Sequence, residues 1–268
     1  MPRTTYAQII SAVFFASYTE GAQEVSFSRE DIRTQAEALG INEPQNLGDV
    51  VYTFRYRRNL PTDIARTAPA GMQWVIIGVG DALYKFTLSQ NTNISPNRHL
   101  LPVKIPDNTP EAISMYSLSD EQSLLSRVRC NRILDMFLGI VTYSLQNHLR
   151  TKIPTIGQIE IDELYVGVNK VGQHFIIPVQ AKVGNDRIGV VQLMQDIEFC
   201  TQKYPNLICI PIAVHHIEAE NRICLFRLTL ENMSVRIVEE KHYQLVNRTE
   251  ISPDYLTHLR DAMEPLTI

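Results

Sequence analysis

The stretch FIIPVQAKVG (residues 175–184) has the apolar composition of a β-strand that is buried on both faces, yet it carries Gln180 and Lys182. Burial of an unpaired amide costs free energy, and burial of an unpaired charge costs far more. These two side chains therefore need partners. The nearest candidates lie in GQIEIDELYVGV (157–168), which the short NKVG turn joins to QHFIIPVQAKV (173–183). The pattern predicts a β-hairpin.

The predicted hairpin gathers four polar side chains. Because side chains alternate between the faces of a strand, Glu160 and Asp162 share one face, and the same holds for the two polar residues of the second strand. If the turn is centred near Val171, Asp162 lies opposite Gln180. Glu160 then lies opposite Lys182, whereas a shift of one residue in the register would separate these pairs. We therefore expect two carboxylates, an amide and an ammonium group in one cluster.

Such a cluster suits phosphodiester hydrolysis. Carboxylate and carbonyl oxygens are the ligands that Mg²⁺ prefers. The ion polarises a phosphoryl group and lowers the pKa of bound water, and a lysine nearby can orient that water or stabilise charge on the phosphate. The alternative is a half-exposed hairpin with a solvated, salt-bridged polar face. The nearly continuous apolar character of the second strand favours the metal site over this alternative.

Three segments in order resemble a known family. IEIDELYVG, FIIPVQAKVG and VVQLMQD are similar to the catalytic core of the PD-(D/E)XK nuclease superfamily. The likeness is greatest to the Mrr-like branch of restriction endonucleases, in which Gln replaces the second acid and the motif becomes Q-x-K. The resemblance implies an α/β fold, with a restriction-endonuclease-like core made of a mixed central sheet flanked by helices. That core, a helix, a three-stranded meander, a crossover helix and a further strand, would cover residues from about 119 to 230.

The resemblance also implies roles for individual residues. Asp162 would be the metal-binding acid, Gln180 would hold the metal from the second acidic position, and Lys182 would be the catalytic lysine. The implied cofactor is Mg²⁺, with Mn²⁺ as a substitute. Two departures stand out, because no proline precedes Asp162 and a Gln is an uncharged ligand. Glu160 or Glu163 would supply the missing charge, although Glu163 faces the other way in a regular strand without a bulge.

Two further residues come from the neighbouring helices. Some members of the family add a Glu from the first helix as a metal ligand, and Glu121 is the candidate in this chain. Members often carry a Gln on the helix after the Q-x-K strand, a place that Gln192 or Gln195 fits. We assign Gln192 to DNA binding.

A long helix is predicted from Ser119 to about Arg150. Ser119 and Gln122 match a capping box at its start, and a broad apolar face runs along it. Gly139 lies inside this segment and marks a kink or a break. Beyond the hairpin we expect a helix at 186–204, strands at 206–217, 221–230 and 235–246, and a closing helix at 252–263.

The first part of the chain has the element order of a winged helix-turn-helix. Helices are predicted at 6–17, 28–40 and 46–59, followed by a hairpin at 73–89. The third helix, which would enter the major groove, carries four candidate DNA-binding residues: Arg55, Tyr56, Arg57 and Arg58. The alternative is a helical domain with a solvated basic face.

Composition and linker signals set the domain boundaries. The segment 93–117 holds four prolines and is predicted to be a linker between a winged-helix DNA-binding domain (1–92) and a nuclease domain (118–268). The four cysteines show no zinc spacing, and no run of about 18 apolar residues is present. We expect a cytoplasmic, prokaryotic protein with no membrane segment.

Together these features predict a Mg²⁺-dependent DNA endonuclease of restriction type. It would hydrolyse phosphodiester bonds in double-stranded DNA, directed by sequence or by base modification. A cut through both strands needs two active sites or two encounters, so a homodimer is expected. The alternative is a DNA-binding regulator on a catalytically inactive nuclease-like scaffold, which the uncharged Gln180 keeps open.

Overall fold

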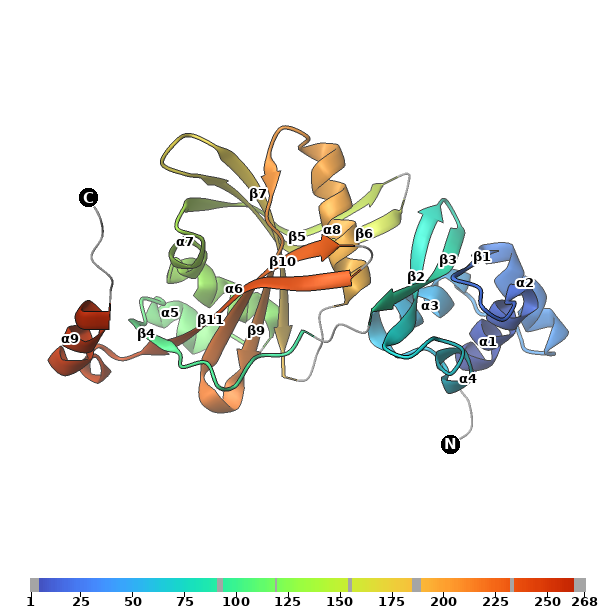
Figure 1. The fold of residues 1–268 in the computed structure, drawn as a ribbon, viewed down its shortest axis with the longest axis horizontal. Helices are drawn as coiled ribbons and strands as arrows, with labels where there is room; N and C mark the ends of the chain where they lie inside the picture. The colour runs from blue at the N-terminus through green and yellow to red at the C-terminus, as the bar shows by residue number, and fades with distance from the viewer. Residues whose placement is uncertain are drawn as a thin grey trace.

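The chain forms a mixed α/β structure in which helices flank a curled, mixed central sheet. The computed structural model describes residues 5–90, 94–118, 120–153, 156–184, 189–231 and 234–262. Figure 1 shows a smaller N-terminal unit beside a larger unit built on the central sheet, with the last helix at the far end of the molecule. Within these residues no helix is long and apolar enough to cross a membrane.

The N-terminal unit packs helices against a small antiparallel sheet. Its elements are α1 (Thr5–Ser17), β1 (Glu24–Ser28), α2 (Arg29–Ala38), α3 (Leu47–Tyr52), the π-helical turn η1 (Thr53–Arg57), α4 (Thr62–Ala65), β2 (Met72–Gly80) and β3 (Leu83–Gln90). The strand order is β1-β3-β2. The predicted helices and hairpin are confirmed, and Ser28 and Asp31 form a capping box at the start of α2. Strand β1 was not predicted.

The second unit contains the central sheet. Its helices are α5 (Glu111–Tyr116), α6 (Glu121–Cys130), α7 (Ile133–Leu138), α8 (Val190–Lys203) and α9 (Pro253–Ala262), with short 3₁₀ turns η2 (Glu218–Glu220) and η3 (Arg248–Glu250). Its strands are β4 (Val103–Pro106), β5 (Val141–Ile153), β6 (Gly157–Val168), β7 (His174–Val183), β8 (Ile208–Cys209), β9 (Ile212–Ile217), β10 (Arg222–Glu231) and β11 (Ser234–Val246). The strand order is β4-β11-β10-β9-β7-β6-β5, and β8 pairs with β7.

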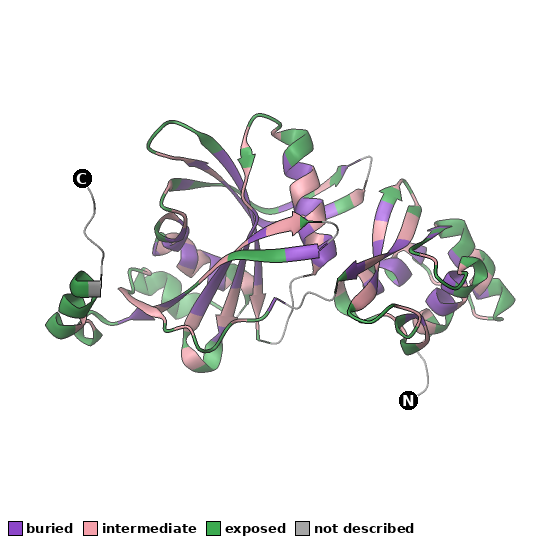
Figure 2. Ribbon diagram, in the orientation of Figure 1, coloured by how far each residue is buried: buried purple, intermediate pink, exposed green. Residues whose placement is uncertain are grey.

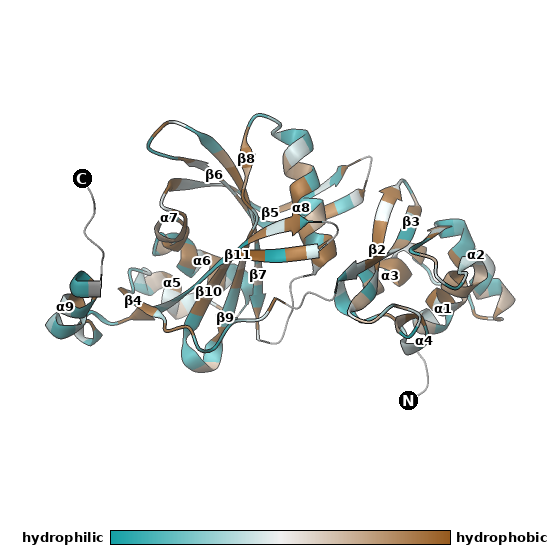
Figure 3. Cartoon of the chain, viewed as in Figure 1, coloured by the Kyte–Doolittle hydropathy of each residue, from teal (hydrophilic) through white to brown (hydrophobic). Residues whose placement is uncertain are grey.

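Helix α8 connects β7 to the parallel strand β9, after an antiparallel meander of β5, β6 and β7. Alternate residues of β7 belong to different apolar clusters, because Ile177 packs with α6 and α7 while Ile176 packs with α8. The sheet is thus covered on both faces. Figure 2 shows the buried residues concentrated in the central strands, and Figure 3 shows that these strands are also rich in hydrophobic residues.

The predicted helix from 119 to 150 is wrong. The segment forms α6 and α7, and then β5, which pairs with β6 along its length. Gly139 adopts a left-handed conformation with φ +66° and closes α7 by donating its N–H to Asp135 O. A β-strand follows because Val141 and the residues after it pair with β6 instead of continuing the helix.

Asp120 caps the start of α6. Asp120 accepts a hydrogen bond from Ser123 N at 2.8 Å. The expected capping box of Ser119 and Gln122 involves a residue outside the described ranges, so that prediction stays open.

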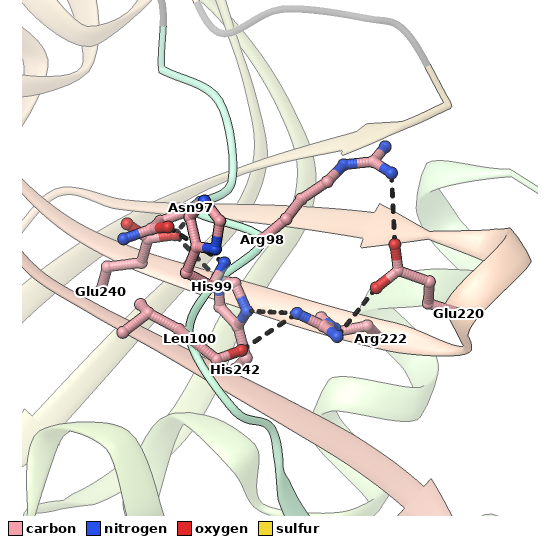
Figure 4. A network of polar contacts seen from close by, with 8 residues as sticks. All are labelled: Asn97, Arg98, His99, Leu100, Glu220, Arg222, Glu240 and His242. Atoms are coloured by element: carbon pink, nitrogen blue, oxygen red, sulfur yellow. Dashed lines mark hydrogen bonds and ion pairs between the residues drawn. The ribbon is translucent and has the colours of Figure 1, made fainter.

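The segment 93–117, predicted to be a linker, is partly built into the second unit. Strand β4 pairs with β11, and a polar network fixes the chain just before it (Figure 4). Asn97 N donates to Glu240 Oε1 at 2.7 Å, and Arg222 Nη1 donates to Leu100 O at 3.1 Å. Arg222 of β10 also contacts His242, a buried residue of β11. These contacts anchor the segment on β10 and β11.

The two units pack against each other. Tyr56, Val75 and Ile77 from the N-terminal unit contact an apolar cluster that includes Val190 and Leu193 of α8. Tyr56 Oη also donates a hydrogen bond across the interface, to Gln195 Oε1 of α8. The N-terminal unit is therefore held close to the central sheet.

Replacing Gly78 by alanine is expected to loosen this docking. A Cβ atom at Gly78 would lie 2.5 Å from Ile156 O, a backbone atom of the second unit that cannot swing aside. Gly80→Ala is the matched control, because its Cβ would meet only the flexible Leu83 side chain at 3.3 Å. Small-angle scattering should give a larger radius of gyration for Gly78→Ala alone. Equal values for both variants would contradict this account.

Candidate active site

The register predicted for the hairpin is confirmed as far as Glu163, whereas the expected pairs of Asp162 with Gln180 and of Glu160 with Lys182 lie beyond the last paired residues. Strands β6 and β7 pair from Val168↔His174 to Glu163↔Val179, which places the turn at the predicted centre. Beyond this point the pairing of β7 with β6 ends, and β7 continues to pair with β9. The two strands of the hairpin therefore part at Asp162.

Two predicted site residues bridge the place where the strands part. Asp162 Oδ2 accepts the backbone N–H of Ala181 at 2.8 Å, and Gln180 Nε2 donates to the carbonyl oxygen of Glu160 at 3.1 Å. These side chains replace the backbone hydrogen bonds that a regular ladder would make. The parted strands thus explain why a carboxylate and an amide are held inside an apolar sheet.

The Asp162 carboxyl group is buried and lies near several charged groups. Burial raises the pKa of its carboxyl group above the usual value, and Glu121 and Glu160 raise it further. The Ala181 N–H and the Lys182 ammonium act in the opposite direction. An added cation would favour the charged form of this carboxylate.

Lys182 is paired with the acid predicted from the preceding helix. Its Nζ lies 2.7 Å from Glu121 Oε1, and only 12% of its side chain is exposed. Glu121 stands in the first turn of α6, so this helix brings a second carboxylate to the cluster. The structure therefore places Glu121, Asp162 and Lys182 around one site.

Gln180 makes an unpredicted contact with Asp196 of α8. Its Nε2 lies 3.2 Å from Asp196 Oδ1 and 3.0 Å from Oδ2, while its own Oε1 is buried without a hydrogen-bond partner among the described residues. Burial raises the pKa of Asp196 well above its usual value, and the Gln180 hydrogen bond lowers it. One feature of the sequence pointed to this contact, because Asp196 falls on the apolar face of the helix predicted at 186–204.

The two candidate helper acids lie in different places. Glu160 is half-buried and forms an ion pair with Arg150 of β5 at 3.1 Å. Glu163 is fully buried, where it accepts hydrogen bonds from Arg129 at 2.9 Å and Ser144 at 2.6 Å. Glu163 is thus engaged by α6 and β5, apart from Asp162 and Lys182, and we leave it out of the proposed site.

A cavity of about 570 Å³ joins these residues to the N-terminal unit. From the second unit it is lined by Glu121, Glu160, Asp162, Lys182, Gln192 and Gln195, and from the N-terminal unit by residues that include Arg55, Tyr56 and Arg57. The cavity therefore brings Lys182, three acids of the second unit and several basic or aromatic side chains to one place.

The predicted DNA-binding residues divide into two groups. Tyr56 Oη donates to Gln195 Oε1 at 2.7 Å, and Arg55 stacks on the Tyr56 ring. The Nε and Nη2 atoms of Arg55 are buried without a hydrogen-bond partner in the described structure. Arg57 and Arg58 are exposed to solvent. One face of η1 thus packs on the second unit while the other stays open.

A metal ion would find two oxygen donors in the parted hairpin. No group of three or more His, Cys, Asp or Glu side chains in the described part of the chain is placed to hold an ion. Gln180 is not one of these four residue types. Its buried Oε1 atom has no hydrogen-bond partner among the described residues, and this fits a metal ligand because buried acceptors rarely remain unpaired. The Asp162 carboxylate lines the cavity, and carboxylate and amide oxygens are ligands of the kind that Mg²⁺ prefers.

The comparisons with known proteins add no relative. No family model, no curated protein and no solved structure matches the chain.

Proposed function

We propose that the chain is a Mg²⁺-dependent DNA endonuclease of restriction type. The observation that carries this proposal is the cavity that holds Asp162 and Lys182 together with arginines of the N-terminal unit. The order of α6, the β5–β6–β7 meander, α8 and β9 supports it, because this is the order that the resemblance to the PD-(D/E)XK superfamily implies.

The proposed site divides its tasks between metal ligands and a lysine. Asp162 and Gln180 hold the metal, with Glu121 or Glu160 as a further ligand. The ion, when bound, activates water and polarises the phosphate. Lys182, held by Glu121 at 2.7 Å, places a positive charge beside the phosphate and stabilises the negative charge that develops there.

The N-terminal unit is proposed to be a winged helix that docks on double-stranded DNA. Its element order, with α3 and η1 before the β2–β3 hairpin, supports this assignment. Arg57 and Arg58 are exposed and available for phosphate contacts. Because each chain offers one proposed site, we propose that a homodimer makes a cut through both strands.

A second function, a DNA-binding regulator without nuclease activity, is favoured by one observation. The second acidic position holds the uncharged Gln180, so Asp162 lacks the paired carboxylate that strengthens Mg²⁺ binding in oxygen-ligand sites. A regulator would bind DNA equally well with and without a metal ion.

Incubation with supercoiled plasmid separates the two functions. Methylated and unmethylated plasmids are mixed with the protein in Mg²⁺, in Mn²⁺ or in a chelator. The nuclease proposal expects nicked or linear plasmid only where a metal is present. Intact plasmid under every condition, combined with retarded migration of the complex, would support the regulator and overturn the nuclease.

A further inference from the structure

Asp196 is a buried acid whose position is not explained by packing. It lies on α8 with 2% of its surface exposed. Burying a carboxyl group is costly, and an apolar side chain of similar size would fill the same space without this cost. The strongest contact of Asp196 is with Gln180 Nε2, which both carboxyl oxygens approach within 3.2 Å. These contacts indicate that Asp196 acts on the Gln180 amide.

The surroundings of Gln180 allow only one orientation of its amide. Nε2 faces three oxygen atoms, namely both carboxyl oxygens of Asp196 and the carbonyl oxygen of Glu160. Turning the amide over would bring Oε1 against these oxygens and lose the hydrogen bonds. Asp196 presents an acceptor whether or not it carries a proton. Oε1 is consequently held on the other side of the amide, where none of the described residues offers it a hydrogen bond.

We propose that Asp196 is a positioning residue, which fixes the amide of Gln180 so that Oε1 is presented as a metal ligand. The inference rests on the proposed function, because a divalent cation is the partner that Oε1 would meet there. It also accounts for the uncharged second position of the motif. Asp196 on α8 supplies the carboxyl group that position 180 lacks, and it acts through the Gln180 amide.

The isosteric variant Asp196→Asn tests this orientation. One of the two positions that face Gln180 Nε2 would then be an NH₂ group, and two donors repel each other. The Gln180 amide is expected to turn over, which takes Oε1 away from the metal. Mn²⁺ affinity, measured by titration calorimetry without DNA, should fall about 10–100-fold, the usual effect of losing a partner behind a metal ligand.

A compensating change distinguishes positioning from a structural role. In the double variant Gln180→Glu with Asp196→Asn, the new amide donates to one carboxylate oxygen and leaves the other for the metal. Mn²⁺ affinity should return to within about threefold of the wild type. Glu198→Gln is the matched control, because it removes a carboxylate from the same helix at a side chain bonded to Gln202, and it should leave Mn²⁺ affinity unchanged.

Folding is monitored by thermal unfolding of the metal-free proteins. If Asp196→Asn does not fold, Asp196→Leu replaces it, since an apolar side chain with the same branching at Cγ removes the buried acid. Wild-type affinity in either folded Asp196 variant would overturn the inference alone. A loss that the double variant does not repair would also overturn it. Absence of Mn²⁺ binding by the wild type would contradict the proposed function, and the inference with it.

Discussion

Replacing Lys182 by alanine is expected to slow metal-dependent plasmid cleavage at least about 100-fold, the usual effect of removing one group that stabilises transition-state charge. Lys182 is the lysine that lines the cavity next to Asp162, and its Nζ is held 2.7 Å from Glu121. Without it, no ammonium group from β7 stands beside the phosphate. The rate is measured under single-turnover conditions with excess protein.

The fold should survive this change. Glu121 is 34% exposed, so water can solvate its carboxylate after the lysine is lost. Lys170→Ala, in the exposed turn of the same hairpin, removes an equal charge away from the cavity and should cut like the wild type. If Lys182→Ala also cuts like the wild type, the lysine has no part in the reaction.

Replacing Asp162 by asparagine is expected to have a larger effect, a loss of cleavage of about 1000-fold, because a metal contributes several kcal/mol to the stabilisation of the transition state. The asparagine oxygen can still accept the Ala181 N–H that Asp162 Oδ2 now accepts at 2.8 Å, so the parted strands remain bridged. Only the negative charge is lost, and with it the hard ligand that Mg²⁺ needs. Cleavage rate and Mn²⁺ affinity should fall together.

The same variant has a defined effect on stability. Because the pKa of Asp162 is raised in the folded state, its ionisation costs the folded protein stability at pH values above that pKa. This cost declines as the pH falls through the folded pKa and disappears below the unfolded value of about 3.8. Asp162→Asn removes this dependence and should unfold at an equal or higher temperature at pH 7.

An exposed aspartate provides the control for this pair of measurements. Asp254→Asn, in the first turn of α9, removes an acid far along the chain from the cavity and should leave cleavage unchanged. Full cleavage by Asp162→Asn would show that the metal is held elsewhere.

The hairpin and its register were predictable because they rest on local signals. An apolar strand and a strand that carries alternating polar residues flank the NKVG turn, and the turn length leaves one register that keeps Glu163 opposite Val179. The resemblance then pointed to the residues that line the cavity. Short local patterns thus gave the part of the site that lies on β6 and β7.

The helix predicted over 119–150 failed because two structures fit one pattern. Val141, Leu145 and Leu149 recur at intervals of four and so suggest a helical face, yet they lie on β5, where Val141 and Leu145 are exposed. An edge strand with few buried residues lacks the simple alternation of a half-buried strand. Gly139 decided the outcome, since its left-handed conformation ends α7.

Contacts between distant segments were beyond the reach of the sequence. The pair Gln180 and Asp196 joins a strand to a crossover helix, and Tyr56 meets Gln195 across 139 positions of the chain. Neither contact follows from periodicity, because each depends on how separate elements pack. The site was therefore predictable along the hairpin but not around it.

The position of β5 at the end of the sheet has a consequence for the behaviour of the protein at high concentration. An unpaired edge of 13 residues would be a template on which another chain could add a strand. The backbone of β5 is irregular at two places, at the register shift between Ser144 and Gln146 and at His148 with φ +49°. The charged side chains of Arg150 and Lys152 follow further along the strand, in ion pairs with Glu160 and Asp81. These irregularities and charges protect the edge against self-association by strand addition.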